Sequence, residues 1–170
     1  MEDRDVRTGA PVRAFVAVSF PPAVREALAR VARELAAEEP AVRPVGGASL
    51  HLTLRFLGDV PASAVEALAS GVRGAVRPRA PFSLDLRGAG AFPEPGRARV
   101  VWARVADASR LAELATAVRA GTSDAPGADD RPFRPHVTIG RVRDPRSLRD
   151  LAARLHELRA VEFGSVRVEA

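Results

Sequence analysis

The chain of 170 residues contains no cysteine, no lysine and no tyrosine, and only one tryptophan. The lack of cysteine excludes disulfide bonds and metal sites built from thiolates. No apolar run approaches the roughly 18 residues that a membrane-spanning helix needs, so we expect no membrane partner. What remains is a globular composition, 46% hydrophobic and 28% charged, in a chain long enough for one domain of ordinary size.

Residues 1–11 are mostly charged and polar and have no apolar segment behind them. We therefore expect a flexible N-terminal tail rather than a signal peptide. Together with the lack of cysteine, this favours a cytoplasmic location.

All of the basic side chains are arginine, and the net charge is +5. Compositional bias from GC-rich codons accounts for most of this pattern. Even so, the planar fork of arginine suits phosphate oxygens, and a basic surface attracts anions. The charge weakly favours a nucleic-acid or nucleotide partner.

Apolar periodicity predicts the same series of elements twice: strand, helix, strand, helix, strand. The first series comprises strands at 13–20, 49–58 and 82–86, with helices at 22–38 and 61–76. The second comprises strands at 99–105, 134–141 and 161–168, with helices at 109–119 and 145–159. Residues 42–47 and 88–96 are predicted to be connections without regular structure.

The repetition predicts an α+β fold made by internal duplication. We expect a single bilobal domain over residues 12–170, with lobes built from repeats at about 12–96 and 97–170. Two antiparallel sheets would face each other across a central cleft, with the helices on the outside.

The most informative feature is a His-x-Thr-aliphatic pattern that occurs in both halves. It stands at His51–Leu54 and again, 85 positions later, at His136–Ile139. Side chains alternate between the two faces of a strand. Each histidine therefore shares a face with the threonine two residues on, and the aliphatic residues between them point into a core.

Two arginines close to these motifs are candidate site residues. By alternation Arg55 shares the face of His51, whereas Phe56 faces the core. Arg141 has the wrong parity for the face of His136. It reaches that face only if the strand bulges near Gly140, where a glycine makes a bulge easy.

Two histidines across a cleft suit general acid–base catalysis, because one imidazole can give a proton while the other takes one. Cleavage of a phosphodiester requires these two roles on opposite sides of the phosphorus atom. Hydroxyl groups of Thr53 and Thr138 would donate to the phosphate oxygens as their charge grows, and Arg141 would pair with the same oxygens. A lone histidine is more often structural, and a metal site would need a third ligand that neither motif supplies.

Four segments resemble the 2H phosphoesterase superfamily, and within it the bacterial and archaeal RNA 2′,3′-cyclic phosphodiesterases, also called 2′-5′ RNA ligases. They are the strand at 13–20 with its Pro-Pro, the string His-Leu-Thr-Leu-Arg-Phe-Leu-Gly at 51–58, Val-Val-Trp-Ala at 100–103, and Arg-Pro-His-Val-Thr-Ile-Gly-Arg at 134–141. The resemblance covers about residues 12–168. Members of this family usually continue with a further strand, so we expect one edge of the fold to be missing.

The resemblance implies metal-independent hydrolysis of a terminal 2′,3′-cyclic phosphate of RNA to a 2′-phosphomonoester. We expect a monomer that needs no cofactor. It makes His51 the proton donor to the 3′-oxygen and His136 the proton acceptor from water. It assigns phosphate binding to Thr53 and Thr138, with help from Arg141. Arg55 is a further candidate for substrate binding.

Three alternatives stay open from the sequence. The protein could join RNA ends through a 2′-5′ bond, which is the reverse of the same chemistry. It could act on a small cyclic nucleotide or on ADP-ribose cyclic phosphate. It could also be a non-catalytic RNA-binding or nucleotide-binding module, although binding alone does not require two proton-transferring groups.

Overall fold

The computed structural model describes residues 10–129 and 131–169, so most of the expected N-terminal tail lies outside the described residues. The strands are β1 (Val12–Ser19), β2 (Val42–Pro44), β3 (His51–Val60), β4 (Phe82–Phe92), β5 (Val100–Val105), β6 (His136–Val142) and β7 (Glu162–Val168). The helices are α1 (Pro22–Glu38), α2 (Val65–Val76), α3 (Ser109–Gly121) and α4 (Leu151–Glu157). None of the described helices is long and apolar enough to cross a membrane.

The strands form an antiparallel sheet in the order β1-β3-β6-β5-β4-β7, and β2 pairs with the same edge of β6 as β3 does. The α+β class is therefore confirmed. The expected separation into two sheets is not found, because β3 and β6 pair directly through Leu52 and Val137. One hydrogen-bonded sheet of seven strands results, and its two parts meet at this single pair of residues.

The antiparallel strand pairs β1–β3 and β5–β6 have the same register. The pairs Ser19–His51, Ala17–Thr53 and Val16–Arg55 correspond, 85 positions later, to Arg104–His136, Trp102–Thr138 and Val101–Gly140. Each strand pair also has a β-bulge at the equivalent place, with Leu54 unpaired in β3 and Ile139 unpaired in β6. This agreement of register and bulge is what an internal duplication predicts.

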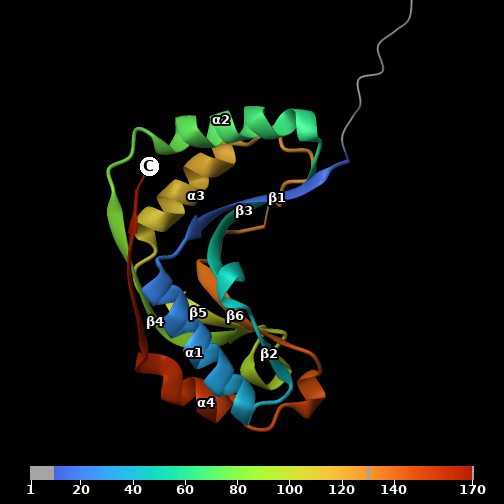
Figure 1. Ribbon diagram of the computed structural model, residues 1–170, viewed down its shortest axis with the longest axis vertical. Coiled ribbons are helices and arrows are strands. Elements are labelled where there is room, and N and C mark those ends of the chain that lie inside the picture. Colours follow the sequence, from blue (N-terminus) through green and yellow to red (C-terminus); the bar gives the residue numbers. More distant parts are fainter. Residues whose placement is uncertain (1–9, 130, 170) are drawn as a thin grey trace, which may run out of the picture.

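The elements of the two sequence repeats are mixed in space. Helix α1 packs against β2, β6 and β7, whereas α3 packs against α2 and β3. Strand β4 belongs to the first repeat in sequence, yet it pairs with β5 and β7. Figure 1 shows the result: α2 and α3 lie beside β1 and β3 at one end, and α1 and α4 lie at the other.

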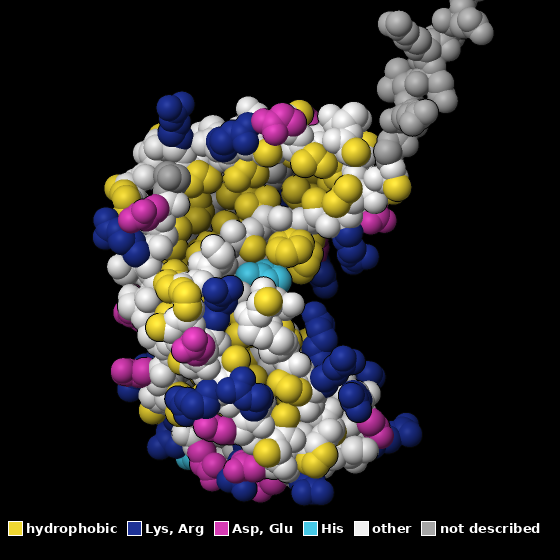
Figure 2. All heavy atoms as spheres, in the orientation of Figure 1, with side chains coloured by type: hydrophobic (Ala, Val, Ile, Leu, Met, Phe, Trp, Pro, Cys, Tyr) yellow, Lys and Arg dark blue, Asp and Glu magenta, His cyan; other side chains and the backbone are white. Residues whose placement is uncertain are grey.

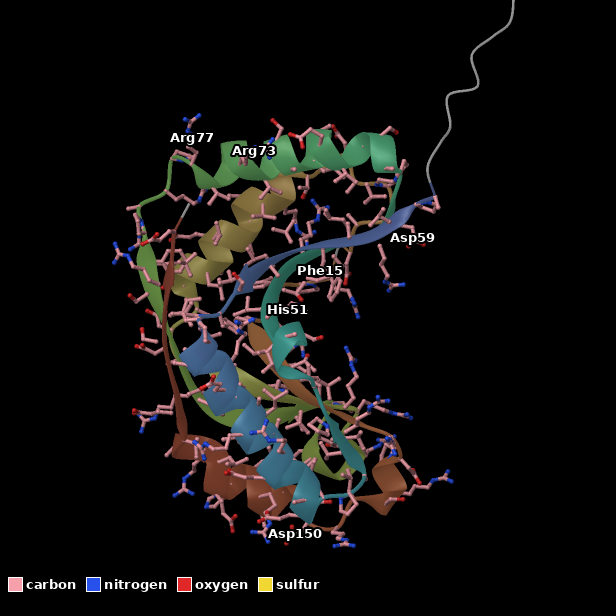
Figure 3. The ribbon with its side chains drawn as sticks, viewed as in Figure 1. Phe15, His51, Asp59, Arg73, Arg77 and Asp150 are labelled. Atoms are coloured by element: carbon pink, nitrogen blue, oxygen red, sulfur yellow. The ribbon has the colours of Figure 1, made fainter. Side chains whose placement is uncertain are left out.

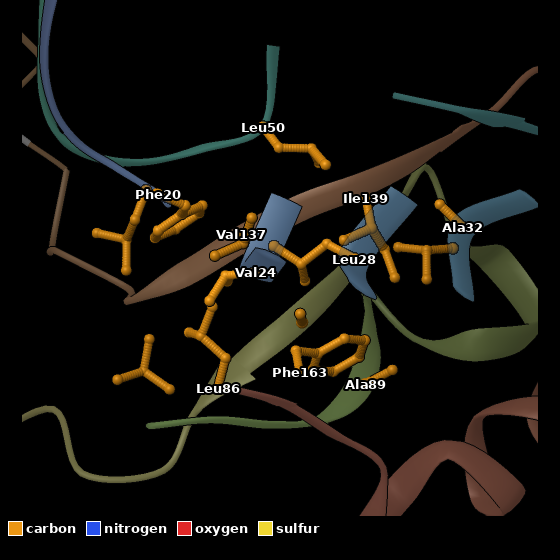
Figure 4. Close-up of a cluster of buried hydrophobic side chains, with 14 of the residues drawn as sticks. Phe20, Val24, Leu28, Ala32, Leu50, Leu86, Ala89, Val137, Ile139 and Phe163 are labelled. Atoms are coloured by element: carbon orange, nitrogen blue, oxygen red, sulfur yellow. The ribbon is translucent and has the colours of Figure 1, made fainter. Parts of the chain in front are cut away.

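The main core lies on the face of the sheet to which Leu52 and Val137 point. Both side chains are fully buried in one cluster with Leu28 of α1, and Figure 4 shows α1 packed against this part of the sheet. Burial of a leucine or valine side chain contributes about 1.5–3 kcal/mol. Because alternation turns Leu52 and Val137 toward this core, their neighbours His51 and His136 must point to the opposite face.

Strand β4 continues to Phe92, although the glycines in residues 88–96 suggested a loop. At Gly90 the reason is packing rather than a turn. A Cβ atom there would lie 2.4 Å from the ring of Trp102 on the neighbouring strand. The glycine leaves room for the indole, so it marks a close approach of a side chain to the backbone.

Candidate active site

The two His-x-Thr motifs come together around the pair Leu52–Val137 that joins β3 to β6. In an antiparallel pair the residues on either side of a bridge are also neighbours. His51 therefore lies next to Thr138, and Thr53 lies next to His136. Diagonal neighbours in such a pair are roughly 7–8 Å apart, which is the separation this register implies for the two histidines. All four side chains are half-buried and share one face of the sheet, which we call the histidine face.

Both imidazoles are held in the same way by the backbone. Nδ1 of His51 donates to the carbonyl oxygen of Ser49 at 2.7 Å, and Nδ1 of His136 donates to the carbonyl oxygen of Arg134 at 2.6 Å. A carbonyl oxygen only accepts, so each Nδ1 carries a hydrogen. Nε2 of each ring is then the nitrogen that gains or loses a proton, and it is turned away from this anchor.

Aromatic rings pack against both imidazoles. Phe15 of β1 stacks on His51, with ring centroids 4.7 Å apart and an interplanar angle of 22°. Phe92 of β4 meets His136 edge-on, with ring centroids 5.2 Å apart, and it also stacks on Trp102 at 5.0 Å. Figure 3 shows Phe15 directly beside His51. These contacts fix the plane of each imidazole, in addition to the Nδ1 hydrogen bonds.

Arg55 does not lie on the histidine face, and the prediction that it does was wrong. The bulge at Leu54 reverses the alternation of β3, so Arg55 is 7% exposed and Phe56 is 47% exposed. The guanidinium of Arg55 is turned to the end of α3. Its Nη1 donates to the carbonyl oxygens of Arg119 and Thr122, and to Oγ1 of Thr122.

Arg141 is exposed on the histidine face, because the strand bulges as the prediction required. The unpaired residue is Ile139, one position before Gly140. Gly140 is buried under β2, where a Cβ atom would lie 2.8 Å from Cγ1 of Val42. In the strand pairs β1–β3 and β5–β6, Arg55 is therefore equivalent to Gly140, and Phe56 is equivalent to Arg141.

Three exposed residues of this region were missed by reasoning from the sequence. Arg43 lies in β2, which was expected to be a connection, and it is directly opposite Arg141. Two like charges in that position repel each other, and among the described residues neither guanidinium has an ion pair. The other two are Phe15 and Phe56. Each is 47% exposed, and their ring centroids are 6.3 Å apart. An offset of 85 applied to Arg141 would have identified Phe56 as its counterpart.

The loop before β6 is hydrogen-bonded to the backbone of Phe56. The backbone N–H of Asp129 donates to the carbonyl oxygen of Phe56 at 3.0 Å. Hydrogen bonds from the side chain of Arg131 lower the pKa of Asp129 to about 2. Asp129 is therefore ionised at neutral pH, and its negative charge is paired with Arg131 rather than with Arg43 or Arg141.

A sheet that carries two histidine–threonine pairs on one face defines an α+β protein with a two-histidine site. This chain belongs to the 2′-5′ RNA ligase superfamily, whose family model matches residues 20–169. It is 36% identical to the RNA 2′,3′-cyclic phosphodiesterase of Methanothermobacter thermautotrophicus, over 92% of this chain and 85% of that protein. It is 39% identical to the protein of the same name from Thermus thermophilus, over 79% and 70% of the two chains. The crystal structure of E. coli LigT complexed with 3′-AMP is similar, with a TM-score of 0.70, 29% identity, and coverage of 93% of this chain and 84% of that one.

Proposed function

We propose that this protein hydrolyses the 2′,3′-cyclic phosphate at the 3′ end of RNA to a 2′-phosphomonoester, without a metal ion. The observation that carries the proposal is the matched anchoring of the two imidazoles. Each donates from Nδ1 to the carbonyl oxygen two residues before it. Each Nε2 can therefore act as an acid when protonated and as a base when neutral.

The reaction breaks one P–O bond and makes another. His136 takes a proton from a water molecule through Nε2, and the water oxygen attacks the phosphorus atom. The bond from phosphorus to the 3′-oxygen breaks, and Nε2 of His51 gives that oxygen its proton. The product is a 3′-hydroxyl beside a 2′-phosphate, and a proton exchange with solvent restores both histidines.

Threonine and arginine side chains stabilise the charge on the phosphate. The hydroxyls of Thr53 and Thr138 share the histidine face and donate to the non-bridging oxygens. Arg141 faces the same side, and its repulsion from Arg43 is relieved when an anion lies between them. A nucleobase would stack on the exposed ring of Phe56, in the manner of aromatic side chains that bind single strands.

The similar proteins support this reaction, because several of them are RNA 2′,3′-cyclic phosphodiesterases by name. They also support a nucleotide ligand, since E. coli LigT has been crystallised with 3′-AMP and with ATP. Ligation through a 2′-5′ bond remains an alternative, because it is the reverse reaction at the same site. The monomeric state and the cytoplasmic location stay predictions from the sequence.

The direct test is hydrolysis of an oligonucleotide that ends in a 2′,3′-cyclic phosphate, in the presence of EDTA. We expect a 2′-phosphate product, and a loss of activity of about 10²–10⁴-fold in His51→Ala and in His136→Ala. His156→Ala is the matched control, because His156 is an exposed histidine on α4 away from the motifs. Full activity in either of the first two variants would exclude the mechanism. Tight binding of 2′-phosphorylated ends without turnover would instead identify a binding module.

The tautomer of the histidines can be tested without a substrate. In a ¹⁵N NMR spectrum at a pH where both imidazoles are neutral, we expect the hydrogen of His51 and of His136 on Nδ1. His156 has no such bond from its ring among the described residues. A histidine side chain in water favours the hydrogen on Nε2. Both active-site rings with the hydrogen on Nε2 would contradict the proposed anchoring.

A further inference from the structure

A depression rich in arginine lies where β4 and β6 end and β5 begins. It has a volume of about 660 Å³ and is lined by Pro93, Gly96, Arg97, Arg99, Arg143, Asp144, Pro145 and Arg146. We call it the basic pocket. None of the predicted site residues belongs to it, and the reaction proposed above does not use it.

The positive charge of the basic pocket is not neutralised by the protein. Asp144 is its only acidic residue, and both oxygens of that carboxylate are engaged locally. One accepts from the backbone N–H of Arg146 and the other from Oγ of Ser147, each at 3.0 Å. Among the described residues, none of the four arginines that line the pocket has an ion pair. Four guanidinium groups therefore surround one hollow with a net positive charge.

Residues of the basic pocket directly adjoin the ends of three strands that carry or border the histidine face. Pro93 follows Phe92, whose ring contacts His136. Arg99 precedes Val100, which is paired with Arg141. Arg143 lies two residues beyond Arg141, directly after the end of β6. At about 3.3 Å per residue, the five residues from Thr138 to Arg143 span roughly 16 Å.

Arginine side chains also gather outside the pocket, on the way to the histidines. Arg43 and Arg141 form a pair between Thr138 and the basic pocket. In Figure 2 dark-blue side chains follow the right-hand edge of the lower half of the molecule, below the cyan histidine. A chain of phosphates that leaves the active site in this direction would meet cations at several successive positions.

We propose that the basic pocket binds backbone phosphates of the RNA strand on the 5′ side of the terminal cyclic phosphate. A stacked strand advances about 3.4 Å per nucleotide, so it covers the roughly 16 Å from Thr138 to Arg143 in about five nucleotides. The guanidinium fork matches the phosphate oxygens, and binding of this kind does not depend on base sequence. The inference rests on the proposed function and extends it: the enzyme prefers RNA of six or more nucleotides to a mononucleotide.

The test uses the double variant Arg97→Ser/Arg146→Ser, because both residues are exposed in short turns and lie outside the catalytic machinery. The matched control is Arg33→Ser/Arg77→Ser, which removes the same charge from exposed positions on α1 and directly after α2. Two substrates are compared in EDTA: a nucleoside 2′,3′-cyclic phosphate, and a single-stranded RNA of ten nucleotides with the same terminus. Binding of the ten-nucleotide product, which ends in a 2′-phosphate, is measured by fluorescence anisotropy at several salt concentrations.

We expect the pocket variant to hydrolyse the mononucleotide at the wild-type rate, with a KM for the long substrate raised about tenfold. The slope of log K against log salt should fall by about 1.4, since each phosphate contact on a single strand contributes about 0.7. The control should change neither the KM ratio nor the slope by a comparable amount. Equal KM ratios and equal slopes in the two variants would overturn the inference. Failure of the wild type to hydrolyse either substrate would instead refute the proposed function.

Discussion

Replacement of Arg55 by methionine separates a structural role from a catalytic one. Arg55 is buried, and its Nη1 donates at 2.6 Å to the carbonyl oxygen of Arg119 and at 2.9 Å to two oxygen atoms of Thr122. Methionine keeps the apolar stem but removes the guanidinium donor. The carbonyl oxygens of Arg119 and Thr122 still accept the backbone N–H groups of Thr122 and Ala125. Each hydrogen bond to a charged group contributes about 1.5–3 kcal/mol, and the substitution removes three of them. Removal of a buried cation returns part of this, so we expect a net loss of about 3 kcal/mol.

A loss of about 3 kcal/mol lowers the melting temperature of a domain of this size by about 6–12 °C. Calorimetry checks this value, and hydrolysis of a nucleoside 2′,3′-cyclic phosphate at 20 °C checks the activity of the folded protein. We expect KM and kcat of Arg55→Met to stay within about twofold of wild type, because the side chain does not touch the substrate. Arg141→Met is the comparison: it should melt close to wild type, since Arg141 is exposed, and lose activity. A normal melting temperature with reduced activity in Arg55→Met would refute the assignment.

Two further predictions concern stability alone. Gly71→Ala should destabilise the protein, because its Cβ atom would lie 1.9 Å from the carbonyl oxygen of Gly121 where α2 crosses α3. Gly74→Ala in the same helix meets no atom within 4 Å and should stabilise the protein by up to about 1 kcal/mol. The melting temperatures of the two variants should therefore shift in opposite directions. Glu39→Gln should lower the free energy of unfolding by about 1–3 kcal/mol, measured by denaturant unfolding. Both oxygens of this buried carboxylate accept backbone N–H groups just before α4, and the NH₂ group of an amide cannot accept one of them.

The sequence predicts the parts of this fold that depend on local periodicity. The helical patterns at 22–38, 61–76 and 109–119 and the strands of both motifs are found, because apolar residues at helical or alternating spacing must be buried together. The helix predicted at 145–159 is shorter than expected: α4 covers only Leu151–Glu157, between 3-10 turns at Pro145–Ser147 and Leu158–Ala160. Helix α1 begins at Pro22 and ends at Glu38 as expected, where a proline suits the first turn. The pairing of strands was harder to predict. Nothing in the local pattern of β3 and β6 indicates that they join through one residue pair rather than face each other.

Alternation failed at Leu54 because one unpaired residue reverses the direction of every side chain that follows. Arg55 was therefore assigned to the wrong face and Phe56 to the core. The same irregularity was anticipated at Gly140, where a glycine signalled it. In β3 the position equivalent to Gly140 carries Arg55, so no glycine indicated a bulge there. The offset of 85 between the two repeats would have indicated it.

The strand pairs β1–β3 and β5–β6 are equivalent in backbone and different in side chains, and this difference suits an asymmetric ligand such as a nucleotide. The imidazoles have the same hydrogen bond, so their own contacts do not distinguish the donor from the acceptor. Their surroundings do: Phe56 stands on the β3 side where Arg141 stands on the β6 side. A terminal nucleotide is likewise unequal, with a base on one side of its cyclic phosphate and a charged strand on the other. An apolar ring on one side and cations on the other would bind it in a single orientation. One histidine would then always face the leaving oxygen, and the other would face the water molecule.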